Sequence, residues 1–270
     1  MIFEVLLPLT LLLIMIATSI LYGKYERKIQ SLLGGRELRL RDVVLMVVAM
    51  GIMVTILAFI SELDIIRAFF LCSYSLVLFL FTYLVVPKWY LDVLSPAFFL
   101  ALYFFYWNEY FLNLFAIVFA IFVSIYLGGL FTWKTTAAFV ALLTFVDVVQ
   151  VFGTRFMVAY GQRVAMLGLP AMIIIPTFPA GYPEGRVFLG LGDVFLTGLL
   201  VIQTTQKYGQ RFGYVTAATI AAIFMLFETV LLNFVVGYFP ATIMVVCGWL
   251  TAVGAKYLHN HVSPKHAKAR

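Results

Sequence analysis

Long uninterrupted apolar runs are the feature that most restricts what this chain can fold into. A helix needs about 20 mostly apolar residues to cross a lipid bilayer. Nine candidate runs of this kind follow one another along the 270 residues, at 2–22, 43–61, 68–86, 91–107, 112–131, 136–153, 187–204, 214–236 and 238–255. The fourth run is the weakest, because it is short and contains Ser95-Pro96.

The composition excludes a water-soluble fold. Apolar residues make up 64% of the chain and charged residues only 11%, against about 45–50% and about 25% in an average soluble domain. We therefore predict an all-α membrane protein, a bundle of nine transmembrane helices in the lipid bilayer. Nucleic-acid binding is excluded, since Lys and Arg at the ends of spans explain the net charge of +6. Cys72 and Cys247 lie within apolar runs and indicate buried side chains rather than a disulfide or a metal site.

The distribution of basic residues predicts the orientation. The connections after odd-numbered runs and the C-terminal tail hold 14 of the 18 Lys and Arg residues, and the other side holds 4. Because cytoplasmic loops carry the excess of positive charge, the N-terminus is expected outside and the C-terminus in the cytoplasm. The first run should be a retained span, since its basic cluster follows it rather than precedes it.

Three carboxyl groups fall inside the apolar runs, where a charge is expensive. Asp147 lies in the sixth run, Asp193 in the seventh and Glu228 in the eighth. A carboxylate at the bilayer centre costs about 2.5–3.5 kcal/mol even on the lenient insertion scale, so each is a functional candidate. A hydrogen bond to a neighbouring helix is the simpler explanation for Glu228. His259, His261 and His266 in the tail do not indicate a metal site.

Asp147 and Asp193 lie on consecutive antiparallel spans that can bring their carboxyls together. Two adjacent carboxyls in a medium of low dielectric cannot both ionise cheaply, so the pair retains one proton. Such a pair can activate a water with one member and protonate a peptide carbonyl with the other, and the two roles cannot be assigned in advance. No metal or cofactor is needed for this chemistry.

Small and polar residues flank both aspartates. Gly190-Leu191-Gly192-Asp193 places two glycines just ahead of the second acid, which permits close approach of another backbone. Thr144 and Gln150 are each three residues from Asp147 and should share its helix face. They are candidates to orient the carboxyl or a water, and a purely structural hydrogen-bonding role is the favoured alternative.

The segment 154–186 between these spans is unusually long and carries four prolines. A long connection in a compact bundle is usually functional or disordered. Within it, residues 172–175 are β-branched or long apolar residues bounded by prolines, and they predict a short strand.

These motifs resemble the GxGD intramembrane aspartyl proteases, the signal peptide peptidases and presenilins. The resemblance rests on Asp147, on Gly190-Leu191-Gly192-Asp193 and on Pro240-Ala241 before the last span. It is closer to signal peptide peptidase, because residues 147–154 with Met157-Val158 and residues 190–198 are similar to that subfamily's sixth and seventh spans. The small size of the chain suggests a microbial or archaeal homologue.

The resemblance implies a bundle of the presenilin and signal peptide peptidase type, forming one integral membrane unit. Residues 1–135 would form a scaffold of five spans, and residues 136–270 would form the catalytic spans six to nine with the 154–186 loop. Asp147 and Asp193 would be catalytic. Seven other residues would support the active site or bind substrate. They are Gln150, Gly190, Leu191, Gly192, Pro240, Ala241 and Thr242. Substrates would be transmembrane peptides or signal peptides.

Two positions depart from the family pattern. Val146 stands where the family commonly has Tyr before the first aspartate, and Thr242 stands where it has Leu after Pro-Ala. Neither change removes a carboxyl. They leave open how water is held and how the substrate backbone is gripped.

Two other functions remain open at this stage. A proton-coupled transporter or cation channel could use the same carboxylates, although no internal repeat is visible. A prepilin-type peptidase also uses a GxGD-like aspartate, but it has fewer spans and no Pro-Ala element. If the chain is a protease, a strand at 172–175 or at 186–189 could pair with an unwound substrate by β-augmentation.

Overall fold

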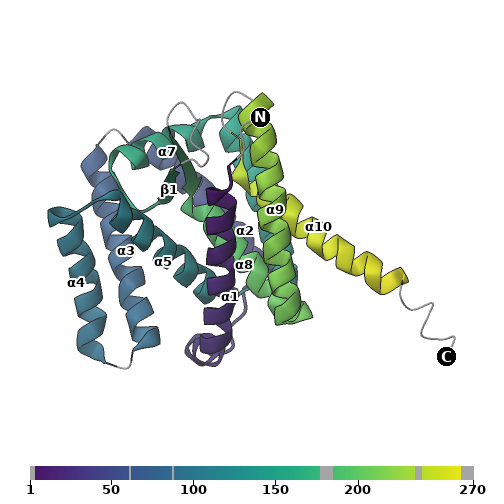
Figure 1. Ribbon diagram of the computed structural model, residues 1–270. Helices are drawn as coiled ribbons and strands as arrows, with labels where there is room; N and C mark the ends of the chain where they lie inside the picture. Colours follow the sequence, from purple (N-terminus) through teal and green to yellow (C-terminus); the bar gives the residue numbers. More distant parts are fainter. Residues whose placement is uncertain (1–3, 61, 87, 177–184, 235–238, 263–270) are drawn as a thin grey trace.

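The computed structural model describes residues 4–60, 62–86, 88–176, 185–234 and 239–262, and these residues form a predominantly helical bundle (Figure 1). The elements in chain order are α1 (Leu6–Leu33), α2 (Leu40–Phe59), α3 (Leu63–Val85), α4 (Trp89–Phe105), α5 (Glu109–Gly128), α6 (Trp133–Val148), the π-helical turn η1 (Val149–Gly153), α7 (Phe156–Met166), β1 (Met172–Pro176), β2 (Arg186–Gly190), α8 (Leu191–Tyr208), α9 (Gln210–Phe234) and α10 (Ala241–Val262).

The prediction of an all-α membrane protein is confirmed by the length and apolarity of the helices. Among the described residues, seven helices are long and apolar enough to cross a membrane. They are α1, α2, α3, α5, α6 with η1, α9 and α10. Each of the nine predicted runs corresponds to a helix, but α4 has only 17 residues and α8 carries a polar second half. The number of spans therefore remains a prediction.

The helix α8 is the centre of the bundle, which explains why it tolerates polar residues. It contacts α1, α5, α6, α9 and α10, and every residue from Val194 to Thr204 is buried. The side-chain amide of Gln203 donates hydrogen bonds of 3.0 Å to the carbonyls of Gly128 and Phe131. A polar helix is stable in this position because its side chains bond to protein rather than face lipid.

A small residue brings α8 close to α5. A Cβ added to Gly198 would lie 2.4 Å from Oγ of Ser124, so no larger residue fits without displacing α5. The same Ser124 hydroxyl shares its proton between the carbonyl of Ala120 in its own helix, 2.6 Å away, and the carbonyl of Phe195 in α8, 3.1 Å away. Close packing around small residues is a common way to associate helices in membranes, and here it fixes α8 against its neighbour.

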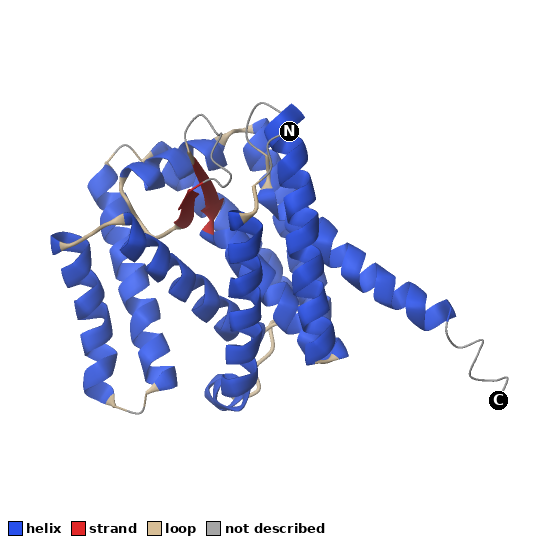
Figure 2. Ribbon diagram, in the orientation of Figure 1, coloured by secondary structure: helices blue, strands red, loops and turns tan. Residues whose placement is uncertain are grey.

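The described part of the connection between α6 and α8 contains the turn η1, the helix α7 and the two strands β1 and β2. The predicted strand at 172–175 is confirmed as β1, which pairs antiparallel with β2 (Figure 2). The expectation of a helical span from residue 187 is wrong at its beginning, because residues 187–190 belong to β2 and α8 begins at Leu191. The helix α7, which precedes the hairpin, was not predicted from the sequence.

The hairpin and the start of α1 lie at the same end of the bundle, with α3 and α4 on one side and α9 and α10 on the other (Figure 1). At the opposite end α1 extends well beyond the apolar run, into the segment that contains Lys24, Arg27 and Lys28. It ends at Gly34, whose φ of 59° lies in the left-handed region that glycine adopts without strain.

Candidate functional site

Asp147 and Asp193 come from two helices that touch. Asp147 is the penultimate residue of α6, two residues before the start of η1, and its side chain is buried. Asp193 is in the first turn of α8 and is partly buried. The helices α6 and α8 are in contact, and Asp147 lies near enough to Asp193 for the two carboxyls to interact electrostatically.

Thr242 gives Asp147 a hydrogen-bonding partner from a third helix. Its Oγ1 donates to Oδ2 of Asp147 across 2.6 Å, and both side chains are buried. Thr242 is the second residue of α10, which Pro240 and Ala241 bring to this point of the bundle. One of the two residues that depart from the pattern of the resembled family therefore hydrogen-bonds to an aspartate.

Asp193 lies against the backbone of Gly190. A Cβ added to Gly190 would be 3.2 Å from Oδ2 of Asp193, whereas a Cβ added to Gly192 would meet no described atom within 4 Å. A side chain at residue 190 would therefore press against the carboxyl of Asp193, which would have to shift by a few tenths of an ångström. Gly192 is exposed and leaves open space beside the first turn of α8.

The strand β2 leads directly into the helix that carries Asp193. The strands are in register with Ile174 opposite Phe188 and Met172 opposite Gly190, and the ladder continues with a hydrogen bond of 3.0 Å from the amide of Leu191 to the carbonyl of Ala171. The position of β2 therefore determines where the first turn of α8 begins.

The hydrogen-bonding pattern shows which backbone groups of β2 point away from β1. Bonded and non-bonded pairs alternate along an antiparallel ladder. Because the amide of Leu191 points toward β1, that of Gly190 points away from it, and so does that of Phe188. Among the described residues, none hydrogen-bonds to the backbone of Phe188 on this outer side. An unpaired strand edge thus ends beside Asp193.

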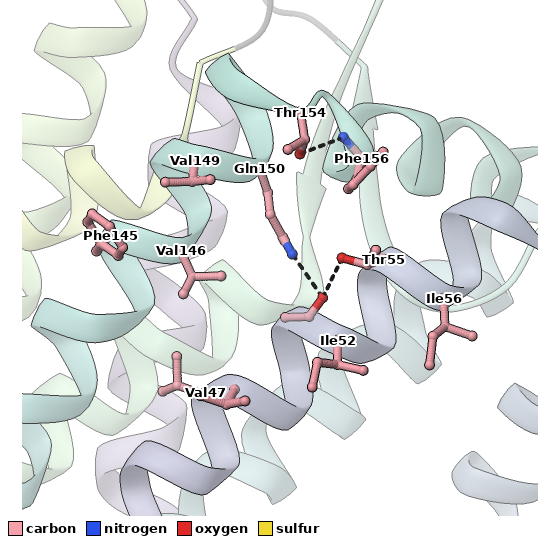
Figure 3. Close-up of a pocket in the computed structure, with 12 residues that line it drawn as sticks. Val47, Ile52, Thr55, Ile56, Phe145, Val146, Val149, Gln150, Thr154 and Phe156 are labelled. Carbon is pink, nitrogen blue, oxygen red and sulfur yellow. Dashed lines mark hydrogen bonds between the residues drawn. The ribbon is translucent and has the colours of Figure 1, made fainter.

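Among the described residues, Gln150 makes no hydrogen bond to Asp147. It lies in η1, and its Nε2 donates a 3.0 Å hydrogen bond to the carbonyl of Gly51 in α2. Thr55 donates to the same oxygen across 2.9 Å (Figure 3). Thr144 also bonds to backbone, at the carbonyl of Val140. Both residues expected beside the carboxyl therefore use their polar groups in structural hydrogen bonds.

An apolar groove separates α2 from α6 and η1 (Figure 3). Its volume is about 360 Å³, and it is lined mainly by apolar side chains that include Ile52, Phe145 and Val149. Neither Asp147 nor Asp193 lines it. The groove lies on the face of α6 turned toward α2, whereas the carboxyl of Asp147 meets α10.

Glu228, the third carboxyl of the apolar runs, is not part of the Asp147–Asp193 pair. It is buried in α9 and interacts electrostatically with Glu4, which precedes α1. The amides of Leu6 and Leu7 donate to Oε1 of Glu4. Among the described residues, Oε2 of Glu228 has no hydrogen-bond partner.

Several residues that hold this region together were not identified from the sequence. Arg163 of α7 donates to the carbonyls of Leu57 and Ile60 at the end of α2, where a cation also meets the negative end of the helix dipole. Asn113 of α5 hydrogen-bonds to β1. An isolated asparagine within an apolar span was the available signal for the second of these.

Comparison with known proteins does not extend the resemblance seen in the motifs. The chain matches no protein-family model and no curated protein.

Proposed function

We propose that this chain is an intramembrane aspartyl endopeptidase that hydrolyses peptide bonds of membrane-spanning substrates. The observation that carries the proposal is the approach of Asp147 and Asp193 from the contacting helices α6 and α8. The hydroxyl of Thr242 on Asp147 adds a positioning contact, and the strand β2, which ends at Gly190, adds a surface for an extended peptide.

The pair would act on a water and a peptide bond together. One carboxylate accepts a proton from the water, whose oxygen attacks the carbonyl carbon while the protonated partner donates to the carbonyl oxygen. The resulting diol collapses when a proton is delivered to the amide nitrogen and the carbon–nitrogen bond breaks. The protonation state belongs to the pair, so either aspartate can be the first base.

The substrate would bind as an extended segment along the outer edge of β2. A helical substrate hides its carbonyls in hydrogen bonds and must unwind before it is cut, and its freed polar groups must then be paired within the protein. The outward-facing backbone of Phe188 and Gly190 offers such pairing. Asp193 follows three residues after Gly190, so the bound strand would pass close to the aspartates.

A cleavage assay tests the proposal directly. Purified full-length protein is reconstituted in vesicles with a transmembrane peptide, and products are identified by mass spectrometry. Wild-type protein should cleave the peptide, while Asp147→Asn and Asp193→Asn should each abolish cleavage and still fold. Glu228→Gln is the matched control, because it neutralises a buried carboxyl outside the pair, and it should retain cleavage.

A flux measurement on the same vesicles distinguishes the proposed protease from the main alternative, a transporter or channel. A proton or cation flux that requires Asp147 and Asp193, without any peptide cleavage, would support a transporter or channel and overturn the proposal.

We further propose that the N-terminus lies outside and the C-terminus in the cytoplasm, which would place the hairpin end of the bundle outside. Substrates would then enter with their own N-termini in the cytoplasm. A reporter fused to the C-terminus should be active only in the cytoplasm, and external activity would contradict this orientation.

A further inference from the structure

The helix α5 places a single polar side chain against the edge of β1. The amide of Asn113 makes two hydrogen bonds to the backbone of Ile174: its Nδ2 donates to the carbonyl across 2.7 Å, and its Oδ1 accepts from the N–H across 2.8 Å. A side-chain amide carries the same donor and acceptor as a peptide group. Asn113 therefore pairs with β1 as one residue of a third strand would.

This pairing agrees with the phase of the ladder. The bond from Leu191 to Ala171 requires that the backbone of Ile174 point away from β2, since bonded pairs alternate. Asn113 is bonded on that outward side. The outer edge of β1 is thus occupied at its middle residue, whereas that of β2 is open at Phe188 in the part of the chain that the structure describes.

A second contact from the same face of α5 holds the other strand. Glu109 lies one helical turn before Asn113 and forms an ion pair with Arg186, the first residue of β2. Residues four apart in a helix are neighbours on its surface. The first turns of α5 therefore contact both strands of the hairpin. Of these two contacts, the ion pair of Glu109 is made to a side chain and the hydrogen bonds of Asn113 are made to backbone.

We infer that Asn113 is a positioning residue that acts as a surrogate strand: it closes β1 to further pairing and fixes the hairpin from which α8 and Asp193 start. The inference rests on the proposed function in so far as it concerns cleavage. Because Asn113 occupies the outer edge of β1, an extended substrate would pair with the outer edge of β2 and not with β1. Loss of its amide opens a second edge and loosens the start of α8.

Hydrogen exchange tests the contact without any assumption about activity. In Asn113→Leu, which has similar size but no donor or acceptor, the Ile174 amide of the full-length protein in detergent should exchange about tenfold faster. Asn113→Asp keeps the acceptor for the Ile174 N–H but loses the donor to its carbonyl, so exchange at Ile174 should rise less than in Asn113→Leu. Asn108→Ala is the matched control, because Asn108 caps the N-terminus of α5 through the amide of Phe111 and, among the described residues, makes no side-chain hydrogen bond to β1 or β2.

Cleavage of a transmembrane peptide then tests the consequence. Asn113→Leu should lower kcat more than it raises KM and should add cleavage products displaced from the main site, whereas Asn108→Ala should leave the product pattern unchanged. Unchanged exchange at Ile174 in Asn113→Leu would overturn the inference, and so would a wild-type product pattern with faster exchange. Absence of any cleavage by the wild-type protein would overturn the proposed function instead, while the exchange data would still decide the role of Asn113 in holding the hairpin.

Discussion

The hydroxyl of Thr242 donates a 2.6 Å hydrogen bond to Oδ2 of Asp147, so the first turn of α10 is tied to the end of α6. The contact joins residues 95 positions apart in the sequence. It leaves Oδ1 of Asp147 for other partners. A buried hydroxyl in this position orients the carboxyl without adding a charge, which suits the proton exchange that the proposed reaction requires.

Replacement of Thr242 by Val should reduce cleavage while the fold is kept. Valine has the shape of threonine but no donor, so the buried carboxyl oxygen loses its partner, an effect worth about ten- to hundredfold in kcat/KM. Thr242→Ser retains the hydroxyl and should recover most of the activity. The measurement is peptide cleavage, with thermal unfolding in detergent as a check on the fold. Equal activity in all three proteins would show that the hydroxyl plays no part in the reaction.

Substitution of Gly190 by Ala should lower turnover without strain in the backbone. Gly190 has φ −63° and ψ 141°, which alanine adopts readily, so the expected conflict is the 3.2 Å approach of the new methyl to Oδ2 of Asp193. Displacement of a reacting group by a fraction of an ångström should cost about tenfold in kcat.

Gly192→Ala is the natural control for that variant, since open space surrounds a Cβ at this position. It should fold as well as wild type and keep most of its turnover. A greater loss of turnover in Gly192→Ala than in Gly190→Ala would mean that contact between residue 190 and the carboxyl is not what matters.

Gln150→Leu should affect stability more than chemistry. The variant loses the hydrogen bond from Gln150 to the carbonyl of Gly51, which should lower the free energy of unfolding by about 0.5–1.5 kcal/mol. Thr55→Val removes the other side-chain donor to that oxygen and should have an effect of similar size. Thermal unfolding and cleavage are measured on the same preparations. If Gln150→Leu lost cleavage while its free energy of unfolding stayed unchanged, Gln150 would have a role in the reaction itself.

The position of the Gln150 side chain shows a limit of prediction from the sequence. The spacing of three residues predicts a shared face with Asp147 only if the helix remains α-helical. The chain instead enters the wider π-helical turn at Val149, and Gln150 turns toward α2. Nothing in the local pattern marks this change, although such turns are frequent at functional sites.

Features set by composition were easier to predict than contacts between distant segments. The apolar runs predicted the helices because membrane spans need a fixed apolar length, and 172–175 predicted a strand. The central position of α8 was not evident, because its polar second half is satisfied by other helices, as in the bonds from Gln203. Thr242 was selected only as part of a motif, and its contact with Asp147 depends on the packing of α10 against α6.

The strand edge beside Asp193 leads to the most specific prediction for catalysis. In Phe188→Pro, the N–H that points away from β1 is removed, while the ladder bonds of the neighbouring residues to β1 remain. Proline is tolerated in an edge strand when the lost N–H faces outward, and it favours an extended conformation at the preceding Val187. The hairpin should therefore persist, and kcat/KM for a transmembrane peptide should fall by about tenfold or more, because the substrate loses a main-chain hydrogen bond that orients it.

Two further variants separate the possible causes of such a loss. Phe188→Ala removes the half-exposed side chain but keeps the N–H, so it should cleave faster than Phe188→Pro. Val187→Pro removes an N–H that bonds to β1 within the hairpin, and Ile174→Pro removes the N–H that bonds to Asn113. Hydrogen exchange of the hairpin should rise in both variants. Full turnover in Phe188→Pro would remove β2 as the surface that receives the substrate, and the aspartates would then have to act on a peptide held by other segments.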